Sequence, residues 1–116
     1  AVFATYLETG RVEMLFTPDN PLAAPGCEFV IAQLVLDFRN EILWPGSVQI
    51  GTRVASVGRS SVKLEQAIFQ NGQCAATSQS VIVQIDVATR QSSPITDSAR
   101  QRLAALIATP AGAEAE

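Results

Sequence analysis

The chain has 116 residues, 47% of them apolar and 16% charged, which fits one globular domain rather than a disordered segment. Eight basic and eleven acidic residues give a net charge of −3, which argues against binding to nucleic acid or to an anionic membrane surface. The sequence contains no histidine, which excludes Ser–His–Asp and Cys–His catalytic arrangements and histidine-ligated zinc.

Two cysteines, Cys27 and Cys74, are too few for a disulfide framework or a four-cysteine metal site. We therefore expect both thiols to be reduced, the protein to be cytoplasmic, and no metal to be bound. The longest apolar run is only a few residues, which is too short for a helix that spans a bilayer.

Residues 1–16 are predicted to form a long helix. Phe3, Leu7, Gly10 and Met14 recur at helical spacing and therefore share one face. A glycine on this face costs about 1 kcal/mol relative to alanine, and it is tolerated where the helix must approach another segment closely. Residues 17–26 hold three of the six prolines and are predicted to be a loop.

Residues 28–39 are predicted to form a strand that is buried on one side. One face carries only apolar side chains: Val30, Ala32, Leu34, Leu36 and Phe38. The opposite face is mixed: Phe29, Ile31, Gln33, Val35 and Asp37. The apolar side chains on this second face, together with Ile82, predict additional burial there by self-association.

Two further strands alternate in the same way, residues 47–57 and residues 61–70. Their predicted inward side chains are Val48, Ile50, Thr52, Val54, Val62, Leu64 and Ile68. Asn71-Gly72 predicts a type I′ hairpin turn, because both central residues of that turn need a positive φ. The returning strand, residues 74–87, is predicted to present one apolar face: Val81, Val83, Ile85 and Val87.

The last predicted element is a helix that begins at about Thr96, with Thr96 or Asp97 as its N-cap. Its predicted apolar stripe is Leu103, Leu106 and Ile107. Residues 109–116 are small and polar, and are predicted to be a disordered tail. The order of elements predicts a single α+β domain, residues 1–108, in which a curved antiparallel sheet wraps the long N-terminal helix.

Four stretches of the sequence carry a resemblance to a known family. Residues 1–11 resemble a helix with an aromatic residue followed by Tyr/Phe-x-Glu-x-Ala-Arg, and Val57-Gly58-Arg59-Ser60-Ser61 matches a Gly-x-Ser-Ser turn. The other stretches are Asp37-Phe38-Arg39 followed by Trp44-Pro45-Gly46, and Asp86-Val87-Ala88-Thr89-Arg90 followed by Ser93-Pro94-Ile95. In this order they resemble the hotdog fold, in particular the acyl-CoA thioesterase family related to 4-hydroxybenzoyl-CoA thioesterase.

The resemblance implies a hotdog fold whose first strand and catalytic, aspartate-containing loop are expected before residue 1. It implies hydrolysis of acyl-CoA thioesters to free acid and coenzyme A, with coenzyme A as part of the substrate and no separate cofactor. It also implies a homodimer or homotetramer, with neither nucleic acid nor membrane as a partner. One alternative is a non-catalytic hotdog module that binds acyl thioesters or serves in assembly. Another is an unrelated α+β ligand-binding domain.

Glu8 is the candidate catalytic residue, because thioester hydrolysis needs an activated water or a carboxylate nucleophile. The alternative for Glu8 is an ordinary i,i+3 ion pair with Arg11. The resemblance implies that one turn approaches coenzyme A, and its hydroxyls and guanidinium suit phosphate oxygens: Gly58, Arg59, Ser60 and Ser61. The alternative is a solvated β-turn in which Gly58 supplies an unusual φ.

Three aromatic residues, Phe3, Tyr6 and Phe38, are candidates to line an acyl pocket, and the alternative is that they belong to the core. Arg53 and Lys63 are expected to add positive charge near the coenzyme A turn. The sequence departs from the family pattern at Gly10, where alanine is usual.

Overall fold

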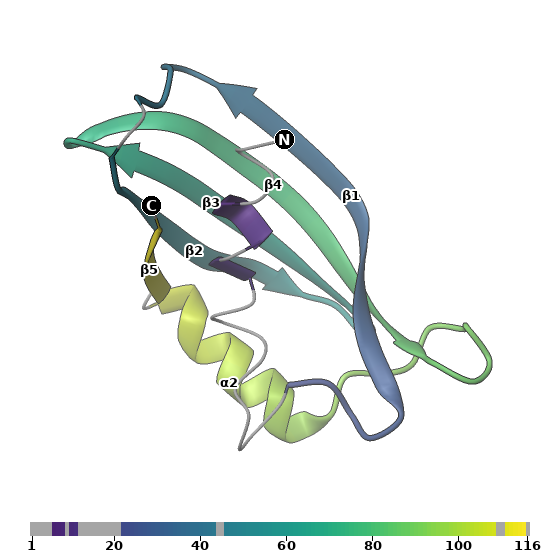
Figure 1. Cartoon of the computed structure of the whole chain (residues 1–116). Helices are drawn as coiled ribbons and strands as arrows, with labels where there is room; N and C mark the ends of the chain where they lie inside the picture. Colours follow the sequence, from purple (N-terminus) through teal and green to yellow (C-terminus); the bar gives the residue numbers. More distant parts are fainter. Residues whose placement is uncertain (1–5, 9, 12–21, 44–45, 109–110, 116) are drawn as a thin grey trace.

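The computed structural model describes residues 6–8, 10–11, 22–43, 46–108 and 111–115. These residues form an antiparallel sheet with the strand order β1-β4-β3-β2-β5 (Figure 1). The elements in chain order are β1 (Cys27–Phe38), β2 (Val48–Val57), β3 (Ser61–Gln70), β4 (Gln73–Asp86), α2 (Asp97–Ala108) and β5 (Ala111–Ala115). Helix α2 and the short helical turns near the N-terminus lie on the same side of the sheet. We call this side the covered face and the opposite side the outer face.

Residues 6–8 and 10–11 are helical, as predicted, and form what we call the N-terminal helical segment. The rest of the predicted helix, including Phe3 and Met14, lies outside the described residues, so a long helix is not shown. Leu7 is fully buried, and Gly10 is buried directly against side chains of β2 and β3. The close approach that a glycine permits therefore occurs at this position.

Strand β1 has the predicted extent but not the predicted faces. Its pairing with β4 shifts between Ile31 and Gln33, so Ala32 is an extra residue that forms a β-bulge. Before the bulge, Phe29 and Ile31 lie opposite Gln84 and Ile82 and face the covered side. The prediction that these side chains lie on the outer face is wrong, because one inserted residue exchanges the two faces of a strand.

Strand β4 also turns a different face to the core than predicted. Its side chains on the covered face are buried: Ala76, Ser78, Ser80, Ile82 and Gln84. Ala75 and Ile85 are buried as well, and Ile85 belongs to the predicted face. Val81 and Val83 are half-buried on the outer face, and Val87 is exposed beyond the end of the strand. The Asn71-Gly72 turn, with φ values of 52° and 78°, has the predicted positive φ at both residues. The pairing of β3 with β4 then shifts between Ile68 and Phe69, which leaves Ala75 as an extra residue and sets the register of the rest of β4.

Two apolar clusters fill the space between the covered face and the helices. The first includes α2: Leu22, Val54, Val62, Leu64, Ile82, Ile95, Ala99 and Leu103. The second includes the N-terminal helical segment: Tyr6, Leu7, Val48, Ile50, Ile68 and Ala76. All seven inward side chains predicted for β2 and β3 are buried, which confirms their faces.

Helix α2 begins as predicted, because Thr96 Oγ1 accepts a hydrogen bond from Ala99 N at 3.2 Å and so caps the helix. Leu103 is fully buried and Leu106 packs against the first cluster, but Ile107 is 46% exposed, so the apolar stripe is narrower than predicted. Within the described part of the chain, no helix has both the length and the apolar character to cross a bilayer.

The C-terminal residues differ from the predicted disordered tail, because residues 111–115 form strand β5. This strand pairs with β2 from Val48↔Ala115 to Thr52↔Ala111. A strand edge offers unpaired N–H and C=O groups that accept an extended segment of almost any sequence. The small residues of β5 give no side-chain signal for a strand, since the pairing depends on backbone hydrogen bonds.

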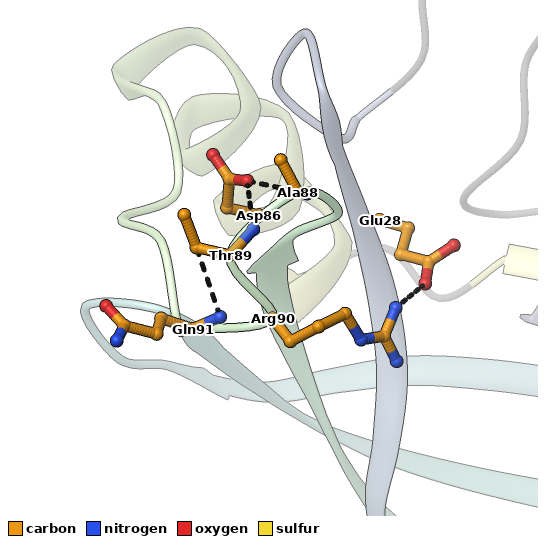
Figure 2. A network of polar contacts seen from close by, with 6 residues as sticks. All are labelled: Glu28, Asp86, Ala88, Thr89, Arg90 and Gln91. Atoms are coloured by element: carbon orange, nitrogen blue, oxygen red, sulfur yellow. Dashed lines mark hydrogen bonds and ion pairs between the residues drawn. The ribbon is translucent and has the colours of Figure 1, made fainter.

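The loop after β4 is closed by its own hydrogen bonds (Figure 2). Asp86 Oδ1 accepts from Ala88 N at 2.8 Å and from Thr89 N at 3.0 Å. Arg90 has a positive φ of 61°, and its Nη1 lies 3.1 Å from Glu28 Oε1 on β1. The loop thereby links the end of β4 to the start of β1.

Candidate functional site

The N-terminal helical segment rests on a buried polar row of the covered face. Thr52 on β2 lies opposite Gln66 on β3, which lies opposite Ser78 on β4. Gln66 Nε2 donates to Leu7 O at 2.8 Å and to Thr52 Oγ1 at 3.2 Å. Gln66 Oε1 accepts from Arg11 Nη1 at 3.1 Å. One buried amide thus fixes both turns of the helical segment on the sheet.

Gln66 was not among the residues singled out from the sequence, although a signal was present. It occupies an inward position of an alternating strand, between Leu64 and Ile68, where an apolar side chain is the rule. A polar side chain at such a position needs hydrogen-bond partners, and therefore indicates a polar contact across the core.

Glu8, the candidate catalytic carboxylate, is exposed on the helical segment. The alternative ion pair with Arg11 does not form, because the Arg11 guanidinium is buried and donates to Gln66 instead. Burial lowers the pKa of Arg11 from its ordinary value, and the negative charge of Glu8 acts in the opposite direction. Glu8 therefore acts on Arg11 through its charge only, and its carboxylate makes no ion pair with the described residues.

Three strand carboxylates are paired with arginines: Asp37 with Arg39 at 3.5 Å, Glu28 with Arg90 at 3.1 Å, and Glu65 with Arg53 at 2.5 Å. The last pair changes the expectation for the coenzyme A turn, because Glu65 balances the charge of Arg53. Lys63 is exposed on the outer face of β3. The described residues hold no group of three or more side chains suited to a metal ion. Cys27 and Cys74 are free thiols.

The predicted coenzyme A turn joins β2 to β3. Gly58 N donates to Ser61 O at 2.8 Å, which closes the turn. The positive φ suggested for Gly58 is wrong, since the described glycines with positive φ are Gly26 and Gly72. A Cβ at Gly58 would lie 2.7 Å from Ser61 Oγ, so the absence of a side chain permits this close approach.

Backbone carbonyls attach this turn to the rest of the molecule. Ser60 O accepts from Gln84 N at 2.7 Å, and Arg59 O accepts from Ile95 N at 2.9 Å. Arg100 Nη2, on α2, donates to the same Arg59 carbonyl at 3.3 Å. The Arg59 guanidinium itself is exposed and makes no hydrogen bond or ion pair with the described residues. The fold thus adds a second guanidinium to the turn, 41 positions away in the sequence.

The three aromatic candidates have different environments. Tyr6 is buried in the second apolar cluster, as the core alternative predicts. Phe38 is 61% exposed at the end of β1, opposite Ala76, which belongs to the same cluster as Tyr6. Phe3 lies outside the described residues. Of the two described candidates, Tyr6 therefore belongs to the core and Phe38 to the exposed surface.

Phe38 belongs to an apolar strip on the covered face of β1. We call these four residues the β1 strip: Ile31, Leu34, Leu36 and Phe38. Three of them are exposed, and Leu36 is half-buried against the second cluster. An exposed run of large apolar side chains on the side of the sheet that holds the core indicates a binding surface.

A comparison with family models identifies the chain over nearly its whole length. Residues 1–103 match the model of the thioesterase-like superfamily. The chain belongs to this superfamily. The predicted resemblance to a hotdog thioesterase family is thereby confirmed. The described antiparallel sheet with a helix is consistent with the hotdog fold. None of the curated proteins matches the chain.

Solved structures agree with this assignment. A predicted thioesterase from Bacillus stearothermophilus is 29% identical with a TM-score of 0.80, over 91% of this chain and 80% of that one. A thioesterase from Thermus thermophilus, complexed with coenzyme A and Zn, is 30% identical with a TM-score of 0.76, over 95% and 80%. A DHNA-CoA thioesterase from Staphylococcus aureus, 20% identical with a TM-score of 0.77 over 90% and 76%, shares the fold.

Proposed function

We propose that this protein hydrolyses acyl-CoA thioesters to a free acid and coenzyme A. The observation that carries the proposal is the superfamily match over residues 1–103, a range that includes both Glu8 and the turn at Arg59. The Thermus thermophilus relative, at 30% identity, was solved with coenzyme A bound, which supports coenzyme A as the carrier here. The substrate's acyl group lies along the β1 strip in this proposal.

Glu8 acts as the general base in the proposed reaction. Its carboxylate takes a proton from a water molecule as the water oxygen attacks the thioester carbonyl. The C–S bond then breaks, and the leaving coenzyme A thiolate takes that proton from Glu8, which restores the carboxylate. Glu8 suits this role because it is exposed and makes no ion pair with Arg11. Gln66 serves as a positioning residue, since its amide holds Leu7 O in the same helical segment.

The test is thiol release from a panel of short, long and aromatic acyl-CoA thioesters, with Glu8→Gln as the key variant. We expect the variant to lower kcat by about 100-fold or more, the usual contribution of a general base. Its thermal stability should not change, because the side chain is exposed. Glu41→Gln, another exposed carboxylate, is the matched control. No thiol release from any thioester would reject the enzyme and leave the non-catalytic binding module.

The turn at residues 58–61 binds the coenzyme A phosphates in this proposal, through the exposed guanidinium of Arg59 and that of Arg100, which donates to the Arg59 carbonyl. Because charge-assisted contacts to phosphate weaken with salt, Arg59→Ala should raise the Kd for coenzyme A about tenfold at low ionic strength and less at high salt. Arg39→Ala, an exposed arginine on another loop, is the control. Equal Kd values for both variants would exclude the turn as the phosphate site.

We also propose that two copies associate through β1, which pairs with β4 on one side and is an edge of the described sheet on the other. A long edge strand with exposed apolar side chains favours pairing with another chain. Light scattering should give a dimer or a larger closed assembly for the wild type, and a smaller species for Ile31→Lys. Leu43→Lys, an exposed loop position, is the control. A monomeric wild type would contradict this association.

A further inference from the structure

Two buried serine hydroxyls on the covered face of β4 have no hydrogen-bond partner among the described residues. Ser78 is 4% exposed and Ser80 is 1% exposed, and neither Oγ is bonded. Other buried polar side chains on this face are satisfied, since Gln66 bonds to Thr52 and Gln84 bonds to three backbone groups. Buried hydroxyl groups without partners are unfavourable and uncommon, so two on one strand need an explanation.

The neighbours of these hydroxyls point to a ligand. The register places Ser80 opposite Leu34 and Ser78 opposite Leu36, so both hydroxyls border the β1 strip. Side chains directly opposite each other on antiparallel strands have Cβ atoms about 5 Å apart. On the covered face, the apolar side chains of the β1 strip and the unpartnered hydroxyls of β4 are therefore direct neighbours.

The spacing of the two hydroxyls suits one oxygen atom. Residues i and i+2 of a strand lie about 6.6 Å apart along it. An oxygen midway between the side chains is within reach of hydrogen bonds of about 3 Å from both. Each serine hydroxyl can donate and accept, so the pair accommodates either a hydroxyl or a keto group.

We propose that Ser78 and Ser80 form a hydrogen-bonding subsite that selects acyl groups carrying a hydroxyl or keto oxygen over the plain hydrocarbon chain. The proposal rests on the proposed acyl-CoA function and adds a substrate class to it. The apolar part of the acyl group packs on the β1 strip, and its oxygen reaches across to β4. Such a site disfavours an acyl group that lacks the oxygen, because the two serine hydroxyls then remain without a hydrogen-bond partner when that acyl group is bound.

The test compares octanoyl-CoA with 3-hydroxyoctanoyl-CoA and 8-hydroxyoctanoyl-CoA. We expect wild-type kcat/KM to be about tenfold higher for at least one hydroxylated thioester. Ser78→Ala and Ser80→Ala should each remove most of that preference while hydrolysis of octanoyl-CoA is retained. Ser56→Ala, an exposed serine of β2, should leave the preference unchanged. Equal kcat/KM values for all three thioesters would overturn the subsite and leave the proposed function intact.

A binding experiment separates failure of the subsite from failure of the enzyme. If no thioester is hydrolysed, the Kd values of non-hydrolysable thioether analogues of the same three compounds decide the question. Tighter binding of a hydroxylated analogue, lost in the Ser78→Ala/Ser80→Ala double variant, supports the subsite. Equal binding means that the two hydroxyls hold a trapped water only, which refutes the proposal.

Discussion

Replacing Gly10 by alanine should destabilise the protein, although alanine is the better helix former. A Cβ at this position would lie 2.8 Å from each of three atoms: Gln66 Nε2, Ile50 Cγ2 and Thr52 Oγ1. Ordinary contacts of this kind are longer by roughly 0.6 Å or more, so the helical segment must rise or the strand side chains must move. The three atoms belong to two strands, so no single rotation relieves all the contacts.

The magnitude follows from one stabilising and two destabilising effects. Helix propensity favours alanine over glycine by about 1 kcal/mol. Overpacking of a filled core costs about 1–3 kcal/mol. If the Gln66 amide moves, its bonds to Leu7 O and Thr52 are strained or lost, at about 1 kcal/mol each. The free energy of unfolding should therefore fall by about 2–3 kcal/mol, and Tm by roughly 8–12 °C for a domain of this size.

Gly51→Ala is a control with the same chemical change and the opposite expected sign. Gly51 lies on the neighbouring strand, and no heavy atom lies within 4 Å of where its Cβ would be. Alanine there should stabilise the protein by about 0.5–1 kcal/mol through reduced freedom of the unfolded chain. Urea unfolding followed by circular dichroism measures both variants. A Gly10→Ala protein as stable as the wild type would refute the close seating of the helical segment on the polar row.

Three further changes test the contacts of the turn at residues 58–61 and of the loop after β4. Gln84→Leu should lower the free energy of unfolding by about 3 kcal/mol, because it leaves the part-buried Ala24 N and the carbonyls of residues 93 and 94 without their partner; a Tm equal to the wild type would contradict the hydrogen bonds. Arg90→Gly should raise the free energy of unfolding by about 0.5–1 kcal/mol in a thermal melt, since a positive φ costs arginine more than the exposed contact to Glu28 contributes. Glu28→Gln should change it by less than about 0.5 kcal/mol, and a larger loss would mean that the ion pair matters more than the backbone strain.

The strand spans and the faces of β2 and β3 were predictable because a period of two residues is a local property of the chain. The faces of β1 were not, because the bulge at Ala32 depends on how β1 pairs with β4 and leaves no local trace. In β4, Ser78 and Ser80 occupy the covered face, so the rule that inward residues are apolar selected Val81 and Val83 instead. An apolar pattern identifies a buried face only where no polar group is buried.

In the candidate site too, short stretches of sequence predict some features, whereas others depend on contacts between residues far apart in the chain. Glu8 and the turn at Arg59 are recognisable from short stretches of sequence. The ion pair considered for Glu8 is absent because Gln66 takes the Arg11 guanidinium that an isolated helix would have offered to Glu8. The approach of Arg100 to the turn could not be predicted, since it depends on how α2 packs on the sheet.

Two buried glutamines on the covered face position the two parts of the candidate site, Glu8 and the turn at Arg59. Gln66 fixes the helical segment that carries Glu8, and Gln84 fixes the segments that meet the turn at Arg59. Apolar side chains at these two positions would fill the same space. They would not fix the orientation of the segments packed against them, because the hydrophobic effect is non-directional. Hydrogen bonds between the two amides and backbone groups do fix that orientation, because their geometry is directional. Because both glutamines belong to the same sheet, the sheet sets the distance between the Glu8 carboxylate and the turn at Arg59. A substrate that is contacted at both ends requires this distance to be fixed.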